Sequence, residues 1–453
     1  MSNPILKTFD YSFLSFLKHR VNGGMVLMVV AVLAMIVANS PWAETYHAFW
    51  NHPVSLQVGG FNLFSHHGEP LTLMAFINDA LMAVFFFSVG LEIKREVLVG
   101  ELSSLRQALL PIIAAVGGMI IPVAIYFAMT SGTPAEGGLA IPMATDIAFS
   151  LGVLSLFGKR VPLSLKIFLT AFAVVDDIGG ILVIAFCYTS HLAGGYLLAA
   201  FIILAILLIA NRMQVMSRTF YCVSGIVVWY LFLQSGVHAT IAGVLVAFTI
   251  PSIPCLNVKK YITRIRENIA GFPHFDKSSI LLTPNQIDVL KSIESASDKV
   301  ISPLQFMEDR MHGMVNYVIM PLFAFANAGI TLSGGEGDIA GLVTYAVILG
   351  LMLGKFAGIY LFTWLAVRMR ITSLPQGMDW KNVAGVSLLG GIGFTVSLFI
   401  ANLSFGATDE ALLNQAKLGV LAGTILAGVV GYIVLSFVLP SKKSVLLHDK
   451  SME

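Results

Sequence analysis

Long apolar runs separated by short polar segments make up most of the chain and predict a bundle of membrane-spanning helices. About 20 apolar residues cross a bilayer as an α-helix, and twelve runs reach or approach that length. They lie near 22–42, 72–99, 107–130, 137–158, 163–189, 192–211, 219–234, 237–251, 312–332, 342–367, 383–405 and 416–439. The expected fold is an all-α integral membrane protein with twelve transmembrane helices.

The positions of the basic residues test this count. Lys and Arg favour the cytoplasmic ends of membrane helices. With a cytoplasmic N-terminus, every Lys and Arg except Lys355 and Lys417 falls in a cytoplasmic segment. One span more or fewer would break that alternation. We therefore expect a multi-pass protein, embedded in lipid, with both termini in the cytoplasm.

Four segments lie outside the expected spans of this single transmembrane domain. They are a cytoplasmic amphipathic lead-in at 1–21, an outer β-hairpin at 52–64, a cytoplasmic insertion at 252–306 and a cytoplasmic tail at 440–453. The hairpin is expected because apolar residues alternate around Gly59-Gly60. Within the insertion, Thr283 and Pro284 have the residue types that begin a helix, which predicts a surface helix there.

Composition supports a membrane protein and excludes several other classes. The chain is 57% hydrophobic and only 11% charged, whereas soluble domains carry about 25% charged residues. A net charge of +2 gives no basic surplus that would indicate a nucleic-acid partner. The three cysteines have no disulfide or metal-binding spacing, and no phosphate-binding loop of the ATPase type is present. We expect no cofactor.

Two of the expected spans are interrupted in mid-membrane. The fourth contains Pro142, Thr145 and Asp146, and the eleventh contains Gly390, Gly391 and Gly393. Each is the second span of a three-span set, and the two sets run in opposite directions, as an inverted repeat requires. Unwound backbone is tolerated in a membrane only where protein or a water-filled cavity satisfies it. We therefore expect two broken helices that cross, with charged ends near an acid and a base.

Adjacent carboxylates in the fifth span are the strongest chemical signal. A charge at the centre of a membrane helix costs roughly 2.5–3.5 kcal/mol, so such residues are functional by default. Neighbours on a helix point about 100° apart, so Asp176 and Asp177 cannot both face one centre. Lys355, in the tenth span, is the natural partner of one of them. With Asp146 the buried set is formally −2, and it must take up protons or hard metal cations such as Na⁺.

Three other interpretations of these residues stay open. The first is a structural salt bridge at Asp176 and Asp177 without transport chemistry. The second is a channel, which would need a continuous polar lining, whereas polar residues gather only near the interrupted spans. The third is an intramembrane aspartyl protease, which needs an Asp after a Gly-x-Gly element, and the run GGIGF at 390–394 lacks it.

At these residues the chain resembles the NhaA family of Na⁺/H⁺ antiporters, and the likeness covers nearly the whole chain. The segments that carry it are ALMAVFFFSVGLEIKRE (80–96), MATDIAFSLG (143–152), AFAVVDDIGGI (171–181), SGVHATIAGV (235–244), PLFAFANAGI (321–330), GKFAGI (354–359) and GGIGFTVSLFIA (390–401). Paired broken spans in inverted halves mark transporter sites, a rule that rests in part on NhaA itself.

The resemblance implies electrogenic exchange of cytoplasmic Na⁺ or Li⁺ for external protons in the bacterial cytoplasmic membrane, by a transporter and not an enzyme. It implies a twelve-helix inverted-repeat fold and a homodimer joined through the outer β-hairpin. Asp177 would be the main Na⁺ or Li⁺ ligand, and Asp176 a second titrating carboxylate that can pair with Lys355. Thr145 and Asp146 would compensate one side of the helix breaks, and Lys355 the other.

The family also has a cytoplasmic cluster linked to activation by pH. The matching residues here are Glu92, Lys94, Arg95, Glu96, Glu308 and His312. A basic helix end with surface salt bridges is the alternative interpretation. Two departures from the family pattern stand beside it: the loop before Glu308 is much longer, and Asp309-Arg310 occupies the place where a histidine is expected.

Overall fold

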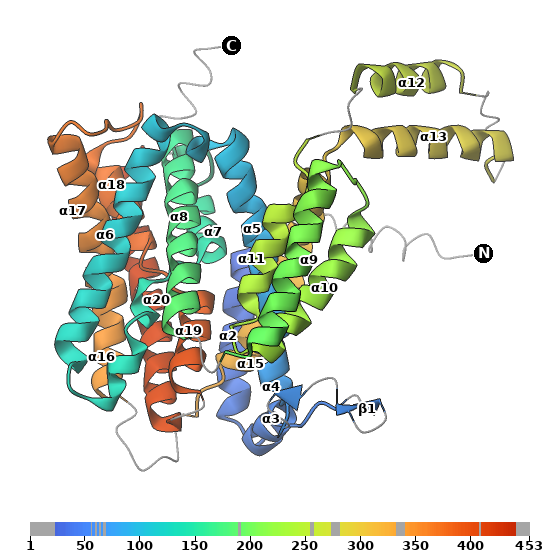
Figure 1. The fold of residues 1–453 in the computed structure, drawn as a ribbon. Helices are drawn as coiled ribbons and strands as arrows, with labels where there is room; N and C mark the ends of the chain where they lie inside the picture. The colour runs from blue at the N-terminus through green and yellow to red at the C-terminus, as the bar shows by residue number, and fades with distance from the viewer. Residues whose placement is uncertain are drawn as a thin grey trace, which may run out of the picture.

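A computed structural model gives the fold of most of the chain. It describes residues 23–440 apart from 56, 59–60, 63–64, 67–68, 189–191, 254–257, 273–280, 332–339 and 407–408. The expected lead-in at 1–21 and almost all of the tail at 440–453 lie outside the described residues. The described part is overwhelmingly helical, and its long helices run roughly alongside one another in a bundle (Figure 1).

Six helices in the described part are long and apolar enough to cross a membrane. They are α4–η1–α5 (Leu73–Phe76, Ile77–Leu81, Met82–Val99), α6 (Leu105–Thr130), α8 (Leu163–Cys187), α9 (Gly194–Arg212), α16–η7–α17 (Leu342–Leu349, Gly350–Gly354, Lys355–Arg368) and α20 (Glu410–Val438). Three sharply bent pairs raise the number of candidate spans to as many as nine. A helical membrane protein is therefore supported, and the count of twelve stays a prediction.

The bent pairs include both of the expected broken spans. In the first, η3–η4 (Pro134–Gly138, Ile141–Met143) meets α7 (Ile147–Ser155) at 44°, and in the second α18 (Trp380–Leu389) meets α19 (Phe394–Phe405) at 44°. The third pair was not expected. Helix α2 (Gly23–Ala38) turns by 113° into α3 (Ala43–Trp50), which lies across one end of the bundle (Figure 1).

The remaining helices are shorter, and the strands are minimal. The helices are η2 (Glu101–Ser103), η5 (Gly158–Arg160), α10 (Arg218–Ser235), α11 (Thr240–Thr249), α12 (Val258–Ala270), α13 (Pro284–Val300), α14 (Pro303–Met314), η6 (Val315–Ile319) and α15 (Met320–Asn327). Strand β1 (Gln57–Val58) pairs antiparallel with β2 (Phe61–Asn62), and β3 (Ser65–His66) with β4 (Glu69–Pro70). The turn at 59–60 lies outside the described residues, so the outer β-hairpin as a whole stays a prediction.

The insertion at 252–306 contains two helices that stand beyond the end of the bundle opposite α3 (Figure 1). Helix α13 begins at Pro284, as the sequence predicts. Its first turn is a capping box, because the backbone N–H of Gln286 donates to Thr283 Oγ1 at 3.4 Å and the N–H of Thr283 donates to Gln286 Oε1 at 2.9 Å. We call this end of the molecule the α13 end, and the other the α3 end.

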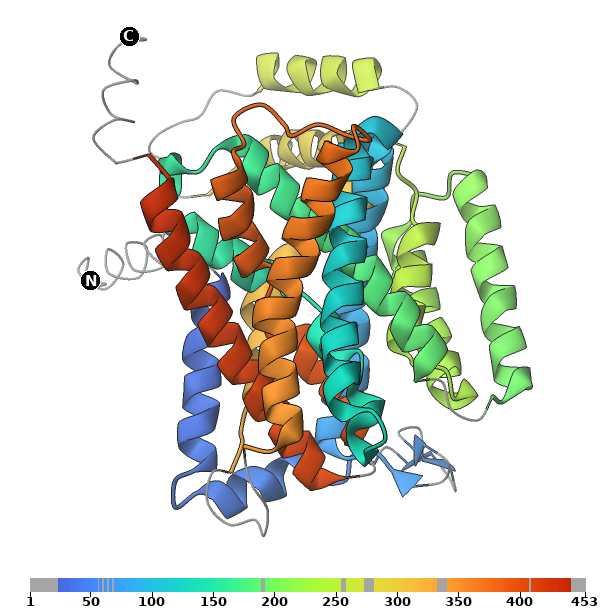
Figure 2. The same ribbon diagram turned by 90° about the vertical axis from the view of Figure 1, so that its left-hand side faces the viewer.

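Helices α6 and α17 pack so closely that only glycine fits at their contact (Figure 2). A Cβ atom added at Gly358 would collide with the carbonyl oxygen of Gly117, and one added at Gly354 would lie 2.7 Å from the Cα of Pro122. Small residues allow this close approach between membrane helices. The contact fixes the position of Lys355, which lies one residue after Gly354 and is fully buried.

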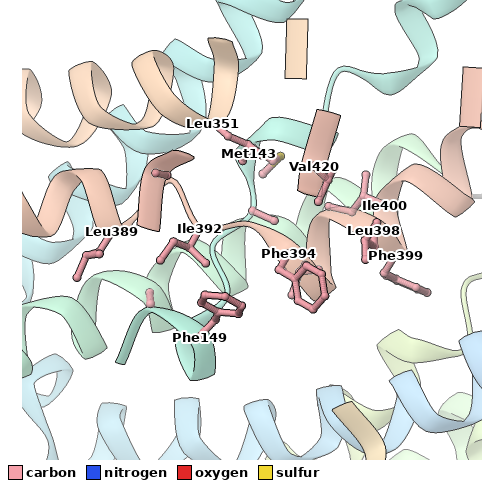
Figure 3. Close-up of a cluster of buried hydrophobic side chains, with 14 of the residues drawn as sticks. Met143, Phe149, Leu351, Leu389, Ile392, Phe394, Leu398, Phe399, Ile400 and Val420 are labelled. Carbon is pink, nitrogen blue, oxygen red and sulfur yellow. The ribbon is translucent and has the colours of Figure 1, made fainter. Parts of the chain in front are cut away.

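Buried apolar side chains surround the point where the two broken helices meet (Figure 3). The rings of Phe149 on α7 and Phe394 on α19 lie 5.8 Å apart, and Leu389 and Ile392 fill the space beside them. The backbone between the helix halves is thus held in an environment that excludes bulk water. Its polar groups must find their partners within the protein.

Candidate functional site

The two unwound segments bind each other directly. The backbone N–H of Asp146 donates to the carbonyl oxygen of Ile392 at 2.6 Å. The hydroxyl of Thr145 donates to the carbonyl oxygen of Gly390, at the end of α18, at 2.8 Å. Both bonds join residues that are about 245 positions apart in the sequence. The breaks in the fourth and eleventh expected spans therefore form one structure.

Two serines that the sequence analysis did not select complete the crossing. Ser150 Oγ donates to the carbonyl oxygen of Leu389 at 2.9 Å, and Ser397 Oγ donates to that of Ile141 at 2.8 Å. All four residues are buried. Ser397 thus gives a donor to a carbonyl at the break in the first broken span. The carbonyl of Leu389 accepts from Ser150 and also from the backbone N–H of Ile392, at 3.1 Å. Their hydroxyls inside apolar runs were a visible signal, but the sequence did not show which carbonyls they would reach.

Asp146 is the N-cap of one helix and binds the N-terminus of another. Its Oδ1 accepts from the backbone N–H of Phe149 in α7 at 3.0 Å. Its Oδ2 accepts from Thr395 in α19, from the hydroxyl at 2.6 Å and from the backbone N–H at 3.3 Å. A carboxylate stabilises the partial positive charge at a helix N-terminus. Asp146 serves two such termini at once, and Thr395 is a further member that the sequence analysis missed.

The glycines and the proline of the breaks allow the backbone to pack tightly. The ring of Pro142 lies against Gly350, whose added Cβ would be 2.6 Å from that of Pro142. A Cβ at Gly390 would collide with the side chain of Ile359, and one at Gly391 with the carbonyl oxygen of Leu351.

At Gly393, the N-cap of α19, an added Cβ would lie 2.9 Å from the carbonyl oxygen of Ala144, in the other broken span. A side chain here would push the two unwound segments apart. It would also collide with the hydroxyl of Ser397, one turn along α19. We infer that this hydroxyl and the close approach of the two breaks together require glycine at this position.

Asp176 and Lys355 form a fully buried ion pair. Lys355 Nζ lies 2.6 Å from Asp176 Oδ2, and neither side chain is exposed. The ammonium group is also 5.6 Å from the centre of the Phe172 ring. The expected pairing is thus confirmed as a contact. No helix end accepts from Lys355 in the described part of the chain, so its role at the helix breaks stays a prediction.

Asp177 lies one position further along α8 and is 5% exposed. Within the described residues its carboxylate has neither a hydrogen bond nor an ion pair. Its charged neighbours are Asp176, Glu92 and Asp146, which repel a second negative charge, and Lys355, which attracts it. Lys355 is already paired with Asp176. A buried carboxylate in this position needs a proton or a metal cation to balance it.

Of the six residues expected to form the cytoplasmic cluster, four lie close to one another, at the α13 end of the bundle. Arg95 Nε lies 2.9 Å from Glu308 Oε1, and Arg95 Nη2 lies 2.9 Å from Glu96 Oε1. Glu92 is an electrostatic neighbour of all three, and also of Asp177. Glu92 is thus the one member of these four that is also a charged neighbour of the buried site.

Lys94 and His312 have other partners. Lys94 Nζ donates to the carbonyl oxygen of Phe248 at 2.7 Å and to that of Ile250, at the C-terminal end of α11. Basic side chains stabilise that end of a helix. The ring of His312 lies 3.1 Å from Asn316 Nδ2, one turn further along its own helix.

The comparison with known proteins agrees with this geometry. A family model described as Na⁺/H⁺ antiporter 1 matches residues 14–435. The chain belongs to this family. It is 65% identical over 434 residues to the Na(+)/H(+) antiporter NhaA of Phocaeicola vulgatus, which covers 96% of this chain and 97% of that relative.

Other family members are similar over the same range. The chain is 60% identical over 430 residues to the Na(+)/H(+) antiporter NhaA of Bacteroides thetaiotaomicron, covering 95% of this chain and 98% of the relative. It is 50% identical over 422 residues to that of Porphyromonas gingivalis strain W83, covering 92% and 93%. The matches therefore span nearly the whole length of this chain and of each relative.

Proposed function

We propose that the protein is a secondary active antiporter that exchanges cytoplasmic Na⁺ or Li⁺ for external protons. The observation that carries this proposal is Asp177, a buried carboxylate without a hydrogen bond or ion pair among the described residues. Family membership and the printed names of the relatives support Na⁺ and H⁺ as the transported ions. The crossing of the broken helices supplies the polar environment in which such an ion loses its water.

Competition for the same carboxylates explains the coupling. Na⁺ or Li⁺ binds the carboxylate oxygens of Asp177, with Asp176 as the second titrating group. Protons bind the same oxygens, so the site carries either the cation or protons across. The empty, charged site does not cross, because its net negative charge is unfavourable in the membrane. When Asp176 takes up a proton, Lys355 loses its ion-pair partner. The exchange is electrogenic.

The proposed topology determines which end of the protein faces the cytoplasm and which faces the external solution. The chain crosses the bacterial cytoplasmic membrane twelve times, in two inverted repeats, with both termini and the insertion at 252–306 in the cytoplasm. The α13 end is then cytoplasmic and the α3 end external. A homodimer forms through the outer β-hairpin at 52–64. The excess of basic residues at the α13 end supports this orientation.

The central test uses the protein reconstituted in proteoliposomes with an imposed pH gradient. Addition of Na⁺ or Li⁺ should dissipate the gradient, and K⁺ at the same concentration should not. Collapse of the membrane potential with K⁺ and valinomycin should speed the response, because the exchange moves net charge. No response to Na⁺ or Li⁺, or an equal response to all three cations, would contradict the proposal.

The Arg95–Glu308 pair predicts a shift in the pH profile. Burial raises the pKa of Glu308, and the Arg95 guanidinium opposes that rise. Arg95→Gln removes the opposing charge, so the pKa rises further and Glu308 ionises at higher pH. We expect the midpoint of activation to move up by about half a pH unit, since a partly exposed ion pair contributes under ~1 kcal/mol. The measurement is Na⁺-driven proton movement between pH 6 and 9.

Arg310→Gln is the matched control for Arg95→Gln. Arg310 lies on the same helix as Glu308, but its guanidinium is 5.2 Å from the centre of the Phe306 ring and is not among the neighbours that set the Glu308 pKa. Its profile should match that of the unmodified protein. An unshifted profile in Arg95→Gln, or an equal shift in Arg310→Gln, would show that the ion pair does not tune activation.

A further inference from the structure

A pocket of about 570 Å³ opens at the α3 end of the bundle. Polar side chains from several helices line it: His47, Asn78, Asp79, Asn402, Glu410 and Lys417. Phe399, on the second broken helix, forms part of its wall. In the proposed orientation this pocket faces the external solution.

Three asparagines form a hydrogen-bonded ladder beside this pocket. Asn402 Nδ2 donates to Asn327 Oδ1 at 2.8 Å, and Asn327 Nδ2 donates to Asn78 Oδ1 at 2.8 Å. The three residues come from α19, α15 and η1. Asn327 is fully buried, and the two outer members line the pocket. The ladder thus ties the broken helix α19 to two neighbouring helices at the pocket.

Each donor amide has a second acceptor on its own helix. Asn402 Nδ2 also donates to the carbonyl oxygen of Leu398 at 2.8 Å, and Asn327 Nδ2 to that of Phe323 at 3.0 Å. Both amides therefore keep one hydrogen bond when the ladder opens, and water from the pocket can satisfy the rest. Opening then avoids the full cost of a buried polar group without a partner.

Helices α19, α15 and α5, which follows η1 directly, supply an apolar layer next to the ladder. The ring of Phe399 on α19 lies 6.0 Å from that of Phe86 on α5 and 6.5 Å from that of Phe323 on α15. All three rings are buried. An apolar constriction of this kind excludes hydrated ions. Asn402 lies three residues after Phe399 on α19, and its hydrogen bond to Asn327 holds this part of the helix against α15.

Helix α19 also reaches the ion site. Its N-terminal turn binds Asp146 through Thr395, and its other end carries Asn402. At the third member of the ladder, Asn78 belongs to a π-helical turn, Ile77–Leu81, a distortion that is frequent at functional sites. A movement of α19 therefore changes the crossing and the pocket together.

We propose that Asn78, Asn327 and Asn402 form the latch of an outer gate on the ion path, closed in this structure. This inference rests on the proposed function. The latch holds α19 against α15 and η1, so that the phenylalanine layer separates the pocket from Asp177. When the ladder opens, α19 moves away, the layer parts and the site becomes accessible from the external solution.

The test measures the apparent affinity for Na⁺ separately on the two faces, in right-side-out and inside-out vesicles. If only a small fraction of molecules has an open outer gate, the apparent dissociation constant at that face equals the intrinsic constant divided by that fraction. Asn402→Leu and Asn78→Leu each remove one ladder bond. We expect KM for external Na⁺ to fall about threefold in each, the effect of an average hydrogen bond between membrane helices. KM for cytoplasmic Na⁺ should stay nearly constant.

Asn327→Leu breaks both bonds and should lower the external KM further, while the added change Asn402→Leu has little extra effect. Independent positions would instead give effects that add. Asn414→Ala is the matched control, because Asn414 lines the same pocket and is outside the ladder. If Asn327→Leu fails to fold, Asn402→Leu and Asn78→Leu still test the latch.

An unchanged external KM in both single-bond variants, or an equal change on both faces, would overturn the latch while Na⁺-driven exchange by the unmodified protein continues. Loss of exchange in the unmodified protein itself would instead overturn the proposed function. The two failures are therefore distinguishable.

Discussion

Replacement of Asp177 by Asn should abolish Na⁺-dependent proton movement in proteoliposomes while the protein still inserts and folds. The amide cannot hold a positive ion by charge, and it releases no proton at accessible pH, so both halves of the exchange are lost. The melting temperature should hold or rise, because an unpaired buried carboxylate costs stability and the amide does not. The measurements are the ΔpH assay and thermal unfolding in detergent.

A matched change separates this effect from the general loss of one carboxylate. Asp379 precedes α18, is exposed and makes no side-chain bond to the helix. Asp379→Asn should retain exchange at the rate of the unmodified protein. Full exchange by Asp177→Asn would contradict the assignment of the ion site. A large fall in the melting temperature of this variant would point to a structural role instead.

Replacement of Lys355 by Ala should lower stability as well as exchange. The change leaves Asp176 in the interior without its only ion-pair partner among the described residues. Loss of one member of a buried ion pair typically costs about 3–5 kcal/mol, because the remaining charge is uncompensated. We expect a clear drop in melting temperature, with Na⁺-driven exchange reduced to background.

The double variant Asp176→Ala with Lys355→Ala is compared with Lys355→Ala alone to test this explanation. Removal of both charges leaves no buried ion without a partner, so much of the lost stability should return while exchange stays absent. An unchanged melting temperature in Lys355→Ala would mean that the lysine acts in transport alone. A double variant less stable than Lys355→Ala would show that packing, and not charge, is the main contribution of the pair.

Features that depend on one residue type in an unusual place could be predicted from the sequence. Pro142 and the run Gly390–Gly393 interrupt apolar segments, and both segments are broken in the structure. The pairing of Asp176 with Lys355 followed because no other basic side chain lies in mid-membrane. The start of α13 followed from the cap at Thr283 and Pro284, since capping is local.

Features that depend on contacts between distant segments could not be predicted from the sequence. Ser150, Ser397 and Thr395 bind groups that are 239 to 256 positions away, and a single sequence gives no such pairing. The asparagine ladder is of the same kind, because Asn327 at a helix end and Asn402 within an apolar run each have an ordinary local interpretation. Helix α3 escaped prediction because it is short and crosses the bundle end instead of spanning it.

The shared cap at Asp146 has a consequence for how such a protein can diverge. One carboxylate serves the N-termini of α7 and α19, which belong to segments almost 250 positions apart. A substitution that moves either helix end therefore changes the surroundings of the other. The two segments cannot drift independently, and mutations at this crossing should be inherited in compensating pairs across the two halves of the gene.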